Sequence, residues 1–251
     1  MKIRSIAILS ASILALGCLA YQVNKVHVLA SNGVSAALSE LSPQWERAAS
    51  SSANLTFDSA GSLKTRIDAG EDFDLAILTM PLIDDLVREG KISPETRTPL
   101  ARVGVGIGIR RGSAKPNIAT AAGLKSVLFK ASSITYSQKG NIRPHIEGVF
   151  QRMGIDSEVK RKAIIEETSG RPEEDVAEGK AELVVALLSE ILPVRGIELL
   201  GPFPEELQNY TAFAAGIRSG SRNFAGANSL LMFLTSPSAR QVLKSKGLDP
   251  N

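Results

Sequence analysis

Cysteine is almost absent from this chain of 251 residues, which contains one, Cys18. Cys18 lies in an N-terminal segment where Lys2 and Arg4 precede an uncharged apolar run over residues 6–19. A basic stretch, an apolar run and then small residues are typical of an export signal, and we predict cleavage after Ala20. The mature chain would then lack cysteine, which excludes disulfides, thiolate nucleophiles and cysteine-based metal sites.

Long apolar runs are lacking as well. The run in the leader is shorter than the roughly 20 residues that a membrane-spanning helix needs. Residues 1–20 are therefore predicted to be a signal peptide, and the mature protein is expected in the periplasm. A lipoprotein modified at Cys18 is the alternative, although only Gly17, directly before it, suits that modification.

Neither sign of charge dominates the mature chain. Without Lys2 and Arg4 it keeps 27 basic and 26 acidic residues. This balance provides no electrostatic footprint for nucleic acid or a membrane surface, so neither is expected as a partner. The sequence also contains no catalytic-serine motif, metal triad, P-loop or dinucleotide fingerprint, and no cofactor or metal is predicted.

The composition, with 43% hydrophobic and 22% charged residues, is that of a soluble globular protein. Within it, a strand–turn–helix unit recurs. An apolar run over residues 26–30 stops at small polar residues, and apolar positions with helical spacing follow at once. Two further units end in small or hydroxyl-bearing residues. The resulting candidate ligand-binding residues are Ser31, Asn32, Gly33, Ser59, Ala60, Gly61 and Thr79.

These turns are expected to converge. Alternating strands and helices with right-handed crossovers place the carboxyl ends of the strands along one edge of the sheet. Ligands bind at that edge in open α/β sheets, and the free N–H groups at a helix start attract anions. The repeated units therefore predict a receptor for an anion.

Residues 101–110 form a long alternating run with Gly104, Gly106 and Gly108. Taken alone, the run fits either an edge strand or a strand that crosses between two lobes, with glycines giving room or flexibility. A second series of strands and helices follows, and residues 210–217 form a predicted returning strand. We predict an α/β fold of two lobes with a ligand cleft between them.

Two arginines carry the physical argument about the ligand. Arg143 and Arg171 each precede a proline at the predicted start of a helix, where a cation is unfavourable by a few tenths to one kcal/mol. Two such placements facing one cleft make sense around a multiply charged anion, and guanidinium groups suit carboxylates. The alternative is that Glu147 and residues 173–174 offset these charges on the surface.

His145 follows Arg143 by two residues and is the candidate general base for any proton abstraction. A hydrogen-bonded structural role is the alternative for a lone histidine. Glu166 and Glu167, at the end of a predicted strand, are the next candidates for the base.

The mature chain resembles type II periplasmic solute-binding proteins, specifically the molybdate-binding-protein-like group. The resemblance rests on LASNGVSAALSEL, DSAGSLKTRIDAGEDFDLAILT, VLFKASSITYS, AEGKAELVVALLSEILPVRGIELLGPFPEELQ and FLTSPSARQVLKSKGLDP. It implies the type II periplasmic-binding-protein fold, with each lobe a mostly parallel sheet flanked by helices. We expect residues 21–104 plus 211–251 in lobe 1 and 105–210 in lobe 2.

In this family serine hydroxyls and backbone N–H groups hold the anion. By position, Ser31 and the 59–61 turn match two serine-bearing loops, while Ile142 and Ser169 match backbone contributors of the second lobe, where Gly170 follows. Leu187 lies where molybdate binders usually carry a tyrosine, and this departure favours a small organic polyanion, a di- or tricarboxylate such as aconitate.

The resemblance therefore implies a monomeric receptor that delivers a small anion to the membrane component of an ABC transporter. Two alternatives remain open. One is a cofactor-free isomerase like the aconitate isomerase-like members of this group, which would interconvert cis- and trans-aconitate by proton abstraction. The other is a molybdate- or tungstate-binding protein.

Overall fold

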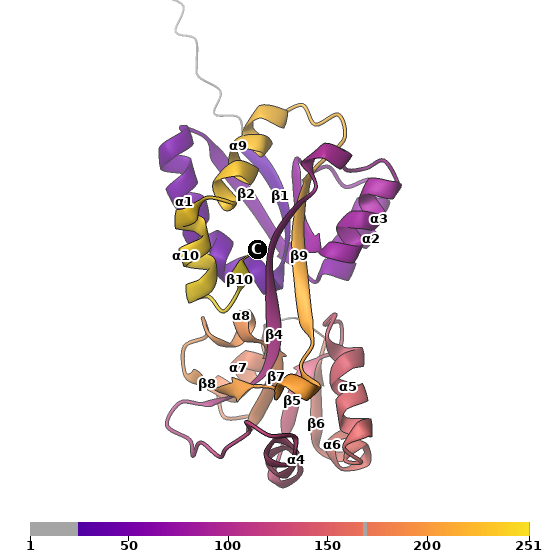
Figure 1. The fold of residues 1–251 in the computed structure, drawn as a ribbon, viewed down its shortest axis with the longest axis vertical. Helices are drawn as coiled ribbons and strands as arrows, with labels where there is room; N and C mark the ends of the chain where they lie inside the picture. Colours follow the sequence, from indigo (N-terminus) through magenta and orange to yellow (C-terminus); the bar gives the residue numbers. More distant parts are fainter. Residues whose placement is uncertain (1–24, 168–169, 251) are drawn as a thin grey trace, which may run out of the picture.

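Two lobes joined by long strands make up the chain in the computed structural model, which describes residues 25–167 and 170–250 (Figure 1). The predicted leader, with Cys18 and the cleavage after Ala20, lies outside the described residues, and so does Ser169. The sheets run continuously in the order β2-β1-β3-β9-β4-β7-β5-β6, with β8 and β10 paired to β4. The predicted two-lobed α/β fold is confirmed.

Lobe 1, at the top in Figure 1, is built on the strands β2, β1, β3 and β9 and the first half of β4. Strands β2, β1 and β3 are parallel, whereas β9 runs antiparallel to both β3 and β4. The elements are β1 (Lys25–Ser31), η1 (Asn32–Val34), α1 (Ser35–Ala49), β2 (Ser52–Asp58), α2 (Ala60–Asp68), β3 (Leu75–Thr79), α3 (Met80–Arg88), η2 (Pro94–Thr96), β4 (Thr98–Arg110), β9 (Tyr210–Ile217), α9 (Phe224–Leu234), α10 (Pro237–Ser245) and β10 (Asp249–Pro250).

Lobe 2 repeats the plan with β7, β5 and β6. Strand β5 is parallel to both β6 and β7, and β4 is antiparallel to β7 and β8. Its elements are α4 (Ala121–Lys130), β5 (Ile134–Ser137), α5 (Arg143–Arg152), α6 (Asp156–Lys162), β6 (Ala163–Glu166), α7 (Arg171–Ala177), β7 (Leu183–Leu187), α8 (Leu188–Ile191), β8 (Ile197–Pro202) and η3 (Glu205–Leu207).

Strand β4 crosses between the lobes, which was one of the two interpretations of its sequence; the other was an edge strand. It pairs with β9 up to Gly104 and with β7 from Val105 onward. Its glycines provide room: an added Cβ at Gly106 would lie 2.5 Å from Leu188 Cδ2, and one at Gly108 would lie 2.6 Å from Val184 Cγ1. We keep the lobe ranges expected from the sequence as a proposal.

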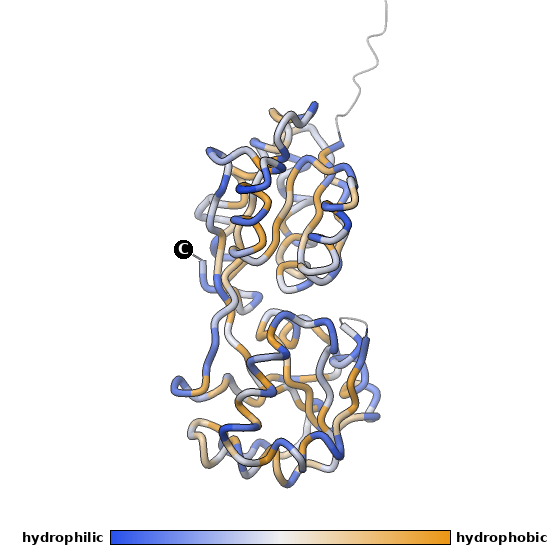
Figure 2. Tube along the Cα trace, turned by 90° about the vertical axis from the view of Figure 1, so that its right-hand side faces the viewer, coloured by the Kyte–Doolittle hydropathy of each residue, from blue (hydrophilic) through white to orange (hydrophobic). Residues whose placement is uncertain are grey.

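The buried core consists mainly of hydrophobic residues. In the trace coloured by hydropathy, hydrophobic residues lie mostly inside each lobe and many hydrophilic ones on the outside (Figure 2). Strand β3 is buried along its whole length, as its unbroken apolar sequence indicates for a strand covered on both faces. One core cluster joins the lobes, since it contains both Trp45 of α1 in lobe 1 and Phe150 of α5 in lobe 2. The core therefore extends from lobe 1 into lobe 2.

The sequence pattern was wrong at several element boundaries. Strand β8 and helix α6 were not predicted, and the described chain ends in β10, which pairs with Arg102 of β4. Helices α5 and α7 begin at Arg143 and Arg171, so that each following proline occupies the second helical position rather than the first. The pre-organised φ of proline suits both positions of a first turn.

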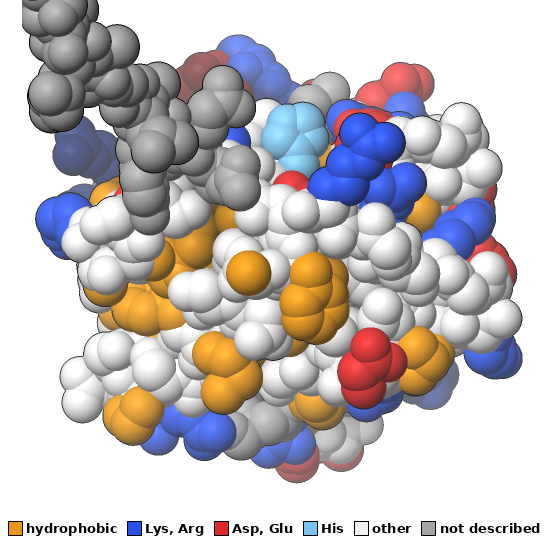
Figure 3. Space-filling model, turned by 90° about the horizontal axis from the view of Figure 1, so that it is seen from above, with side chains coloured by type: hydrophobic (Ala, Val, Ile, Leu, Met, Phe, Trp, Pro, Cys, Tyr) orange, Lys and Arg blue, Asp and Glu red, His pale blue; other side chains and the backbone are white. Residues whose placement is uncertain are grey.

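The end of lobe 1 that is seen from above in Figure 3 carries charged side chains of both signs around its rim. Some hydrophobic side chains gather at the left of this view and others lie singly between uncharged surface. Phe224 and Met232 of α9 are exposed hydrophobic residues. Among the described residues, no helix is long and apolar enough to cross a membrane.

Candidate functional site

A cavity of about 370 Å³ lies between the two lobes. Lobe 1 contributes the end of β2 and the start of α2, and lobe 2 contributes the segments that follow β5 and β6. The lining residues are Asn32, Phe57, Asp58, Ser59, Ser62, Lys139 and Glu167. The carboxyl ends of four strands, β1, β2, β5 and β6, therefore meet around one space, at the edge where open α/β sheets bind ligands.

Ser59 is the N-cap of α2, and its hydroxyl is already engaged. Ser59 Oγ accepts a hydrogen bond from the backbone N–H of Ser62 (3.1 Å) and donates one to Ser62 Oγ (2.9 Å). The backbone N–H of Ser59 donates to Asp58 Oδ1 at 2.6 Å. The two serine hydroxyls form a linked pair in the cavity wall, where a ligand oxygen would compete with the cap.

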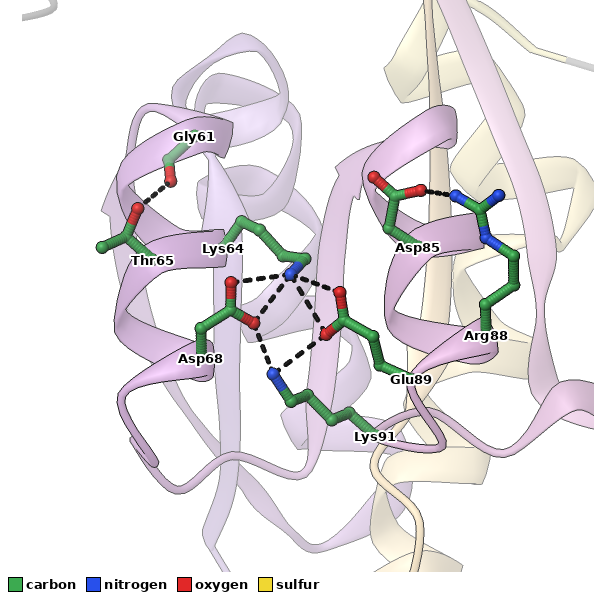
Figure 4. A network of polar contacts seen from close by, with 8 residues as sticks. All are labelled: Gly61, Lys64, Thr65, Asp68, Asp85, Arg88, Glu89 and Lys91. Carbon is green, nitrogen blue, oxygen red and sulfur yellow. Dashed lines mark hydrogen bonds and ion pairs between the residues drawn. The ribbon is translucent and has the colours of Figure 1, made fainter.

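Helix α2 is held from its outer side by a network of alternating charges (Figure 4). Lys64 Nζ bonds both carboxylate oxygens of Asp68 at 2.7 Å and Glu89 Oε1 at 2.9 Å, and Lys91 joins the same two carboxylates. The hydrogen bond from Lys64 holds the pKa of Asp68 below its usual value, and the one from Lys91 adds to this effect. The network ties α2 to the end of α3 and fixes the direction of the serine-bearing turn.

Ser31 and Thr79 are the other two hydroxyl residues predicted at strand ends, and both are buried N-caps. Among the described residues, neither side chain makes a capping hydrogen bond. Thr79 lines a second interlobe cavity of about 460 Å³, which it shares with Asp84, Asn141 and other residues of α3 and β9. Thr79 thus faces a different cavity from Ser59, and Ser31 lines neither of the two.

Gly33 forms a direct contact between the lobes. Its carbonyl accepts a buried hydrogen bond of 2.7 Å from Ser189 Oγ of α8. An added Cβ at Gly33 would lie 2.6 Å from Phe213 Cζ and 3.1 Å from Leu187 Cδ1. The apolar side chain of Leu187 lies beside this glycine and offers no polar group there.

Lys139 was not identified from the sequence. It lies in the turn between β5 and α5, it is exposed, and it lines the cavity with Ser59 and Asn32. Within residues 25–167 and 170–250 it makes no ion pair. Lys139 could have been found from its position two residues after Ser137, where a parallel strand ends. Position just after a parallel strand is the criterion that selected the candidate residues of lobe 1.

The two predicted arginines pair with carboxylates on their own helices. Arg143 Nε donates to Glu147 Oε1 (2.8 Å), and a weaker bond of 3.4 Å runs from its Nη1 to the Gln138 carbonyl. Arg171 contacts three carboxylates, of Glu174, Asp175 and Glu178, at 3.1, 3.2 and 3.6 Å.

These pairs agree with the surface alternative for Glu147 and Glu174. Glu173, which that alternative also included, is 3% exposed and pairs with neither arginine. Neither Arg143 nor Arg171 lines the cavity of Lys139. Their role as ligand-binding residues stays a prediction.

His145 has the structural contact that its alternative reading describes. Its Nε2 lies 2.9 Å from the carbonyl oxygen of Leu207, so a neutral ring donates Nε2–H there. Burial lowers the pKa of His145, although the bond to Leu207 opposes this shift. His145 does not line the Lys139 cavity, whereas Glu167 does. The assignment of His145 as a base stays a prediction.

The remaining predicted residues are distributed as follows. Ala60 is buried at the start of α2, and nothing lies within 4 Å of a Cβ built at Gly61. Ile142 and Gly170 line a small cavity inside lobe 2, behind the two turns. Among the described residues, no group of three or more His, Cys, Asp or Glu side chains is placed to hold a metal ion.

Comparison with known proteins gives matches along nearly the whole chain. A family model described as bacterial extracellular solute-binding protein matches residues 26–249. An aconitate isomerase from Pseudomonas sp is 29% identical over 238 residues, covering 92% of this chain and 90% of that protein.

Two solved structures illustrate the fold. The periplasmic molybdate-binding protein of Azotobacter vinelandii aligns with a TM-score of 0.73 and 18% identity over 89% of this chain and 98% of its own. The sulfate-binding protein SubI of Mycobacterium tuberculosis H37Rv aligns with a TM-score of 0.70 and 17% identity over 90% of this chain and 86% of its own. At these identities the likeness establishes the two-lobed binding-protein fold.

Proposed function

Because the chain belongs to the bacterial extracellular solute-binding protein family, we propose that it binds a small organic polyanion between its lobes. The class we infer is a di- or tricarboxylate such as aconitate. The observation that carries this proposal is the meeting of the Ser59–Ser62 hydroxyl pair with Lys139 in one interlobe cavity. The hydroxyl pair and the start of α2 offer neutral donors, and Lys139 adds a full positive charge.

The size of the cavity supports an organic ligand over a tetrahedral metal oxyanion. Its volume of about 370 Å³ falls in the range of about 300–1,000 Å³ that is common for small-molecule sites. The carboxylates of Asp58 and Glu167 also border it, so that a ligand has to direct its negative groups toward Lys139 and α2 and away from these two. A ligand with carboxylates at fixed separations meets that requirement better than molybdate or tungstate does.

The match to an aconitate isomerase adds a second candidate function, the cofactor-free interconversion of cis- and trans-aconitate. This reaction needs a group that removes a proton from carbon and a group that returns one. Glu167 borders the cavity, whereas Glu166 does not line it. The other bordering carboxylate, Asp58, accepts a hydrogen bond from the Ser59 N–H, and we therefore take Glu167 as the candidate base. The receptor and the isomerase are alternative functions of the same cleft.

For the receptor, the partner would be the membrane component of an ABC transporter, and the protein would act as a monomer in the periplasm. A closed, liganded form would present both lobes to that partner. No cofactor enters either proposal.

Ligand-dependent thermal melting tests the proposed ligand class. The panel contains cis-aconitate, trans-aconitate, citrate, sulfate, molybdate and tungstate. We expect the carboxylates to raise the melting temperature and the inorganic anions to leave it unchanged. Tight molybdate binding without carboxylate binding would overturn the proposal in favour of the molybdate alternative.

Incubation of the purified protein with cis-aconitate in deuterated water separates the receptor from the enzyme. Formation of the trans isomer, with solvent deuterium in the recovered acids, is the expected result for an isomerase. Binding without either change assigns the protein to the receptor function alone. A Glu167→Gln variant then tests the base, because general-base catalysis contributes about a hundredfold to ten-thousandfold.

A further inference from the structure

A small cavity of about 20 Å³ lies inside lobe 2, behind the two turns that begin α5 and α7. This volume is sufficient for one water molecule. The lining combines glycines of both turns, apolar residues of the α5 region and of β7, and four residues with polar side chains. The lining residues are Ser137, Gly140, Asn141, Ile142, Ile146, Gly170, Glu173, Val185, Ala186 and Glu190.

The polar side chains of this cavity are incompletely hydrogen-bonded. Glu173 is 3% exposed, and among the described residues its Oε2 and the Oγ of Ser137 have no hydrogen-bond partner. Glu190, on α8, accepts a long bond of 3.4 Å from the backbone N–H of Leu187. A buried polar atom without a partner is costly, so these atoms require a proton, a water molecule or both.

No cation lines the cavity within the described part of the chain. The titratable groups on the elements packed against α7 lie elsewhere or have other partners. Arg110 of β4 lies near Gly179, Tyr136 of β5 contacts Glu147, and Glu198 of β8 pairs with Lys115. Glu166 belongs to β6, and on α7 itself Arg171 pairs with Glu174 and Asp175.

Glu173 is buried and Glu190 is partly buried, and two neighbouring carboxylates in such surroundings without a cation cannot both remain charged at little cost. Burial raises the pKa of Glu173 to about 7. Burial also raises the pKa of Glu190 to about 8, and the neighbouring charge of Glu173 contributes. The pair titrates as one unit near neutral pH.

We propose that Glu173, Glu190 and Ser137 form a proton-holding water site, in which the two carboxyl groups share one proton and bind one water molecule together with the Ser137 hydroxyl. The site holds its proton directly behind the lobe 2 face of the cleft, since Gly140, Asn141 and Gly170 line it from the side of the turns.

The position of this site couples it to the ligand, a consequence that rests on the proposed binding of an anion in the cleft. A negative ligand near the turns disfavours the charged form of the pair and raises its pKa. The liganded protein therefore holds more protons than the free protein near neutral pH. Affinity should fall as the pH rises through the titration of the pair, by at most about tenfold per pH unit for one proton.

Infrared spectroscopy in deuterated water tests the proton itself without any ligand. A protonated carboxyl group has a carbonyl band separate from that of carboxylates. We expect this band near neutral pH in the wild type, its loss at alkaline pH, and its absence from the Glu173→Gln, Glu190→Gln double variant. A wild-type spectrum without the band at neutral pH would overturn the proposal, and so would a band that persists in the double variant.

Calorimetric titration tests the coupling. Trans-aconitate is titrated near neutral pH in buffers of different ionisation enthalpy, and the slope of the heat against that enthalpy gives the protons taken up. We expect a fraction of one proton for the wild type and for Glu174→Gln, which removes a neighbouring exposed carboxylate, and close to none for Glu173→Gln. Circular dichroism establishes that each variant is folded, and Glu190→Gln replaces Glu173→Gln if the latter does not fold.

An unchanged proton uptake in Glu173→Gln, or none in the wild type, would overturn the coupling while leaving the ligand class intact. If molybdate binds and aconitate does not, the ligand proposal fails, and the same titration with molybdate decides the coupling. If no anion of the panel binds, the proposed function and the coupling fail together, and the infrared experiment still decides the proton site.

Discussion

The two lobes face the cleft with different chemistry. Lobe 1 presents hydroxyl residues at the ends of parallel strands, with Ser31 and Thr79 buried and Ser59 linked to Ser62, and Asp58 is its charged residue in the cavity wall. Lobe 2 contributes only charged side chains to that wall among the described residues, those of Lys139 and Glu167. Behind the lobe 2 turns lie the buried Glu173 and the partly buried Glu190, whereas the turns of lobe 1 are backed by apolar core.

This difference indicates a division of labour. Neutral hydroxyl and N–H groups can donate hydrogen bonds to almost any anion, so that lobe 1 should contribute affinity with little selectivity. A positively charged side chain at one position binds more tightly a ligand whose negative group lies there. Lobe 2 should therefore determine ligand selectivity and the pH dependence of binding. Substitutions matched between the lobes can confirm or remove this contrast.

The largest expected effect concerns the buried pair of lobe 2. A carboxyl group whose pKa is raised by folding stabilises the protein below its unfolded pKa, and this contribution is lost as the pH rises through the folded value. For Glu173, with a folded pKa of about 7, the window runs from about pH 4.3 upward to pH 7, and the loss is on the order of 3 kcal/mol.

Denaturant unfolding between about pH 4 and 9 measures this loss, with pH steps of about one unit. Glu173→Gln should flatten the decline in the free energy of unfolding between about pH 4.3 and 7. Glu174→Gln, the exposed neighbour in α7, should keep it. Equal profiles for all three proteins would remove the pH-sensitive character that we assign to lobe 2.

The second effect distinguishes the cations of lobe 2. Lys139→Met removes a charged partner from the cavity wall, and hydrogen bonds to charged groups are worth about 1.5–3 kcal/mol, or roughly a tenfold to hundredfold change in Kd. Arg171→Met should change the Kd for aconitate by less than about threefold, because that guanidinium is occupied by carboxylates of its own helix. Calorimetric titration measures both, and the reverse ranking would restore Arg171 as the ligand's partner.

The third effect compares two glycines of lobe 1 that occupy similar turns. Gly33→Ala places a methyl group 2.6 Å from Phe213 Cζ at the interlobe contact, and overpacking of this kind costs about 1–3 kcal/mol. Gly61→Ala meets nothing within 4 Å and lies in a helix, where alanine is favoured. Chemical denaturation should show a lower free energy of unfolding for Gly33→Ala and no decrease for Gly61→Ala. Equal stability of the two variants would mean that the Phe213 side chain moves aside without cost.

The sequence predicted the two-lobed fold because periodicity and strand-end residues are local features. The strands over residues 133–137, 183–187 and 210–217 lie where the apolar runs predicted them. Strand β8 was not predicted, since its formation depends on pairing with β4 across the second lobe. A short strand of this kind is specified by its partner more than by its own residues.

The candidate site was predictable only in part, for a similar reason. Strand-end rules selected Asn32 and Ser59 correctly as cavity residues, because the carboxyl ends of parallel strands share an edge. The same rule, applied to β5, would have selected Lys139. The burial of Glu173 could not be read from the sequence, where it stands beside Glu174 in an acidic stretch, since which of the two faces the interior depends on how α7 is rotated on β5.

The smallest expected effect concerns His145, which lies away from both contrasted faces. His145→Phe removes the ring nitrogen that bonds the Leu207 carbonyl, a partly buried contact, and should lower the free energy of unfolding by about 1 kcal/mol. Since burial lowers the pKa of His145, the neutral ring stabilises the protein above its unfolded pKa of about 6.5, and this contribution is lost as the pH falls through the lower folded value. The destabilisation by His145→Phe should therefore shrink on acidification. His27→Phe, at an exposed histidine whose ring contacts the side chain of Asn54, is the control for replacing a histidine by phenylalanine. If the protein isomerises aconitate, turnover by His145→Phe should match the wild type. A fall in turnover of about a hundredfold or more at unchanged stability would instead assign His145 as the base.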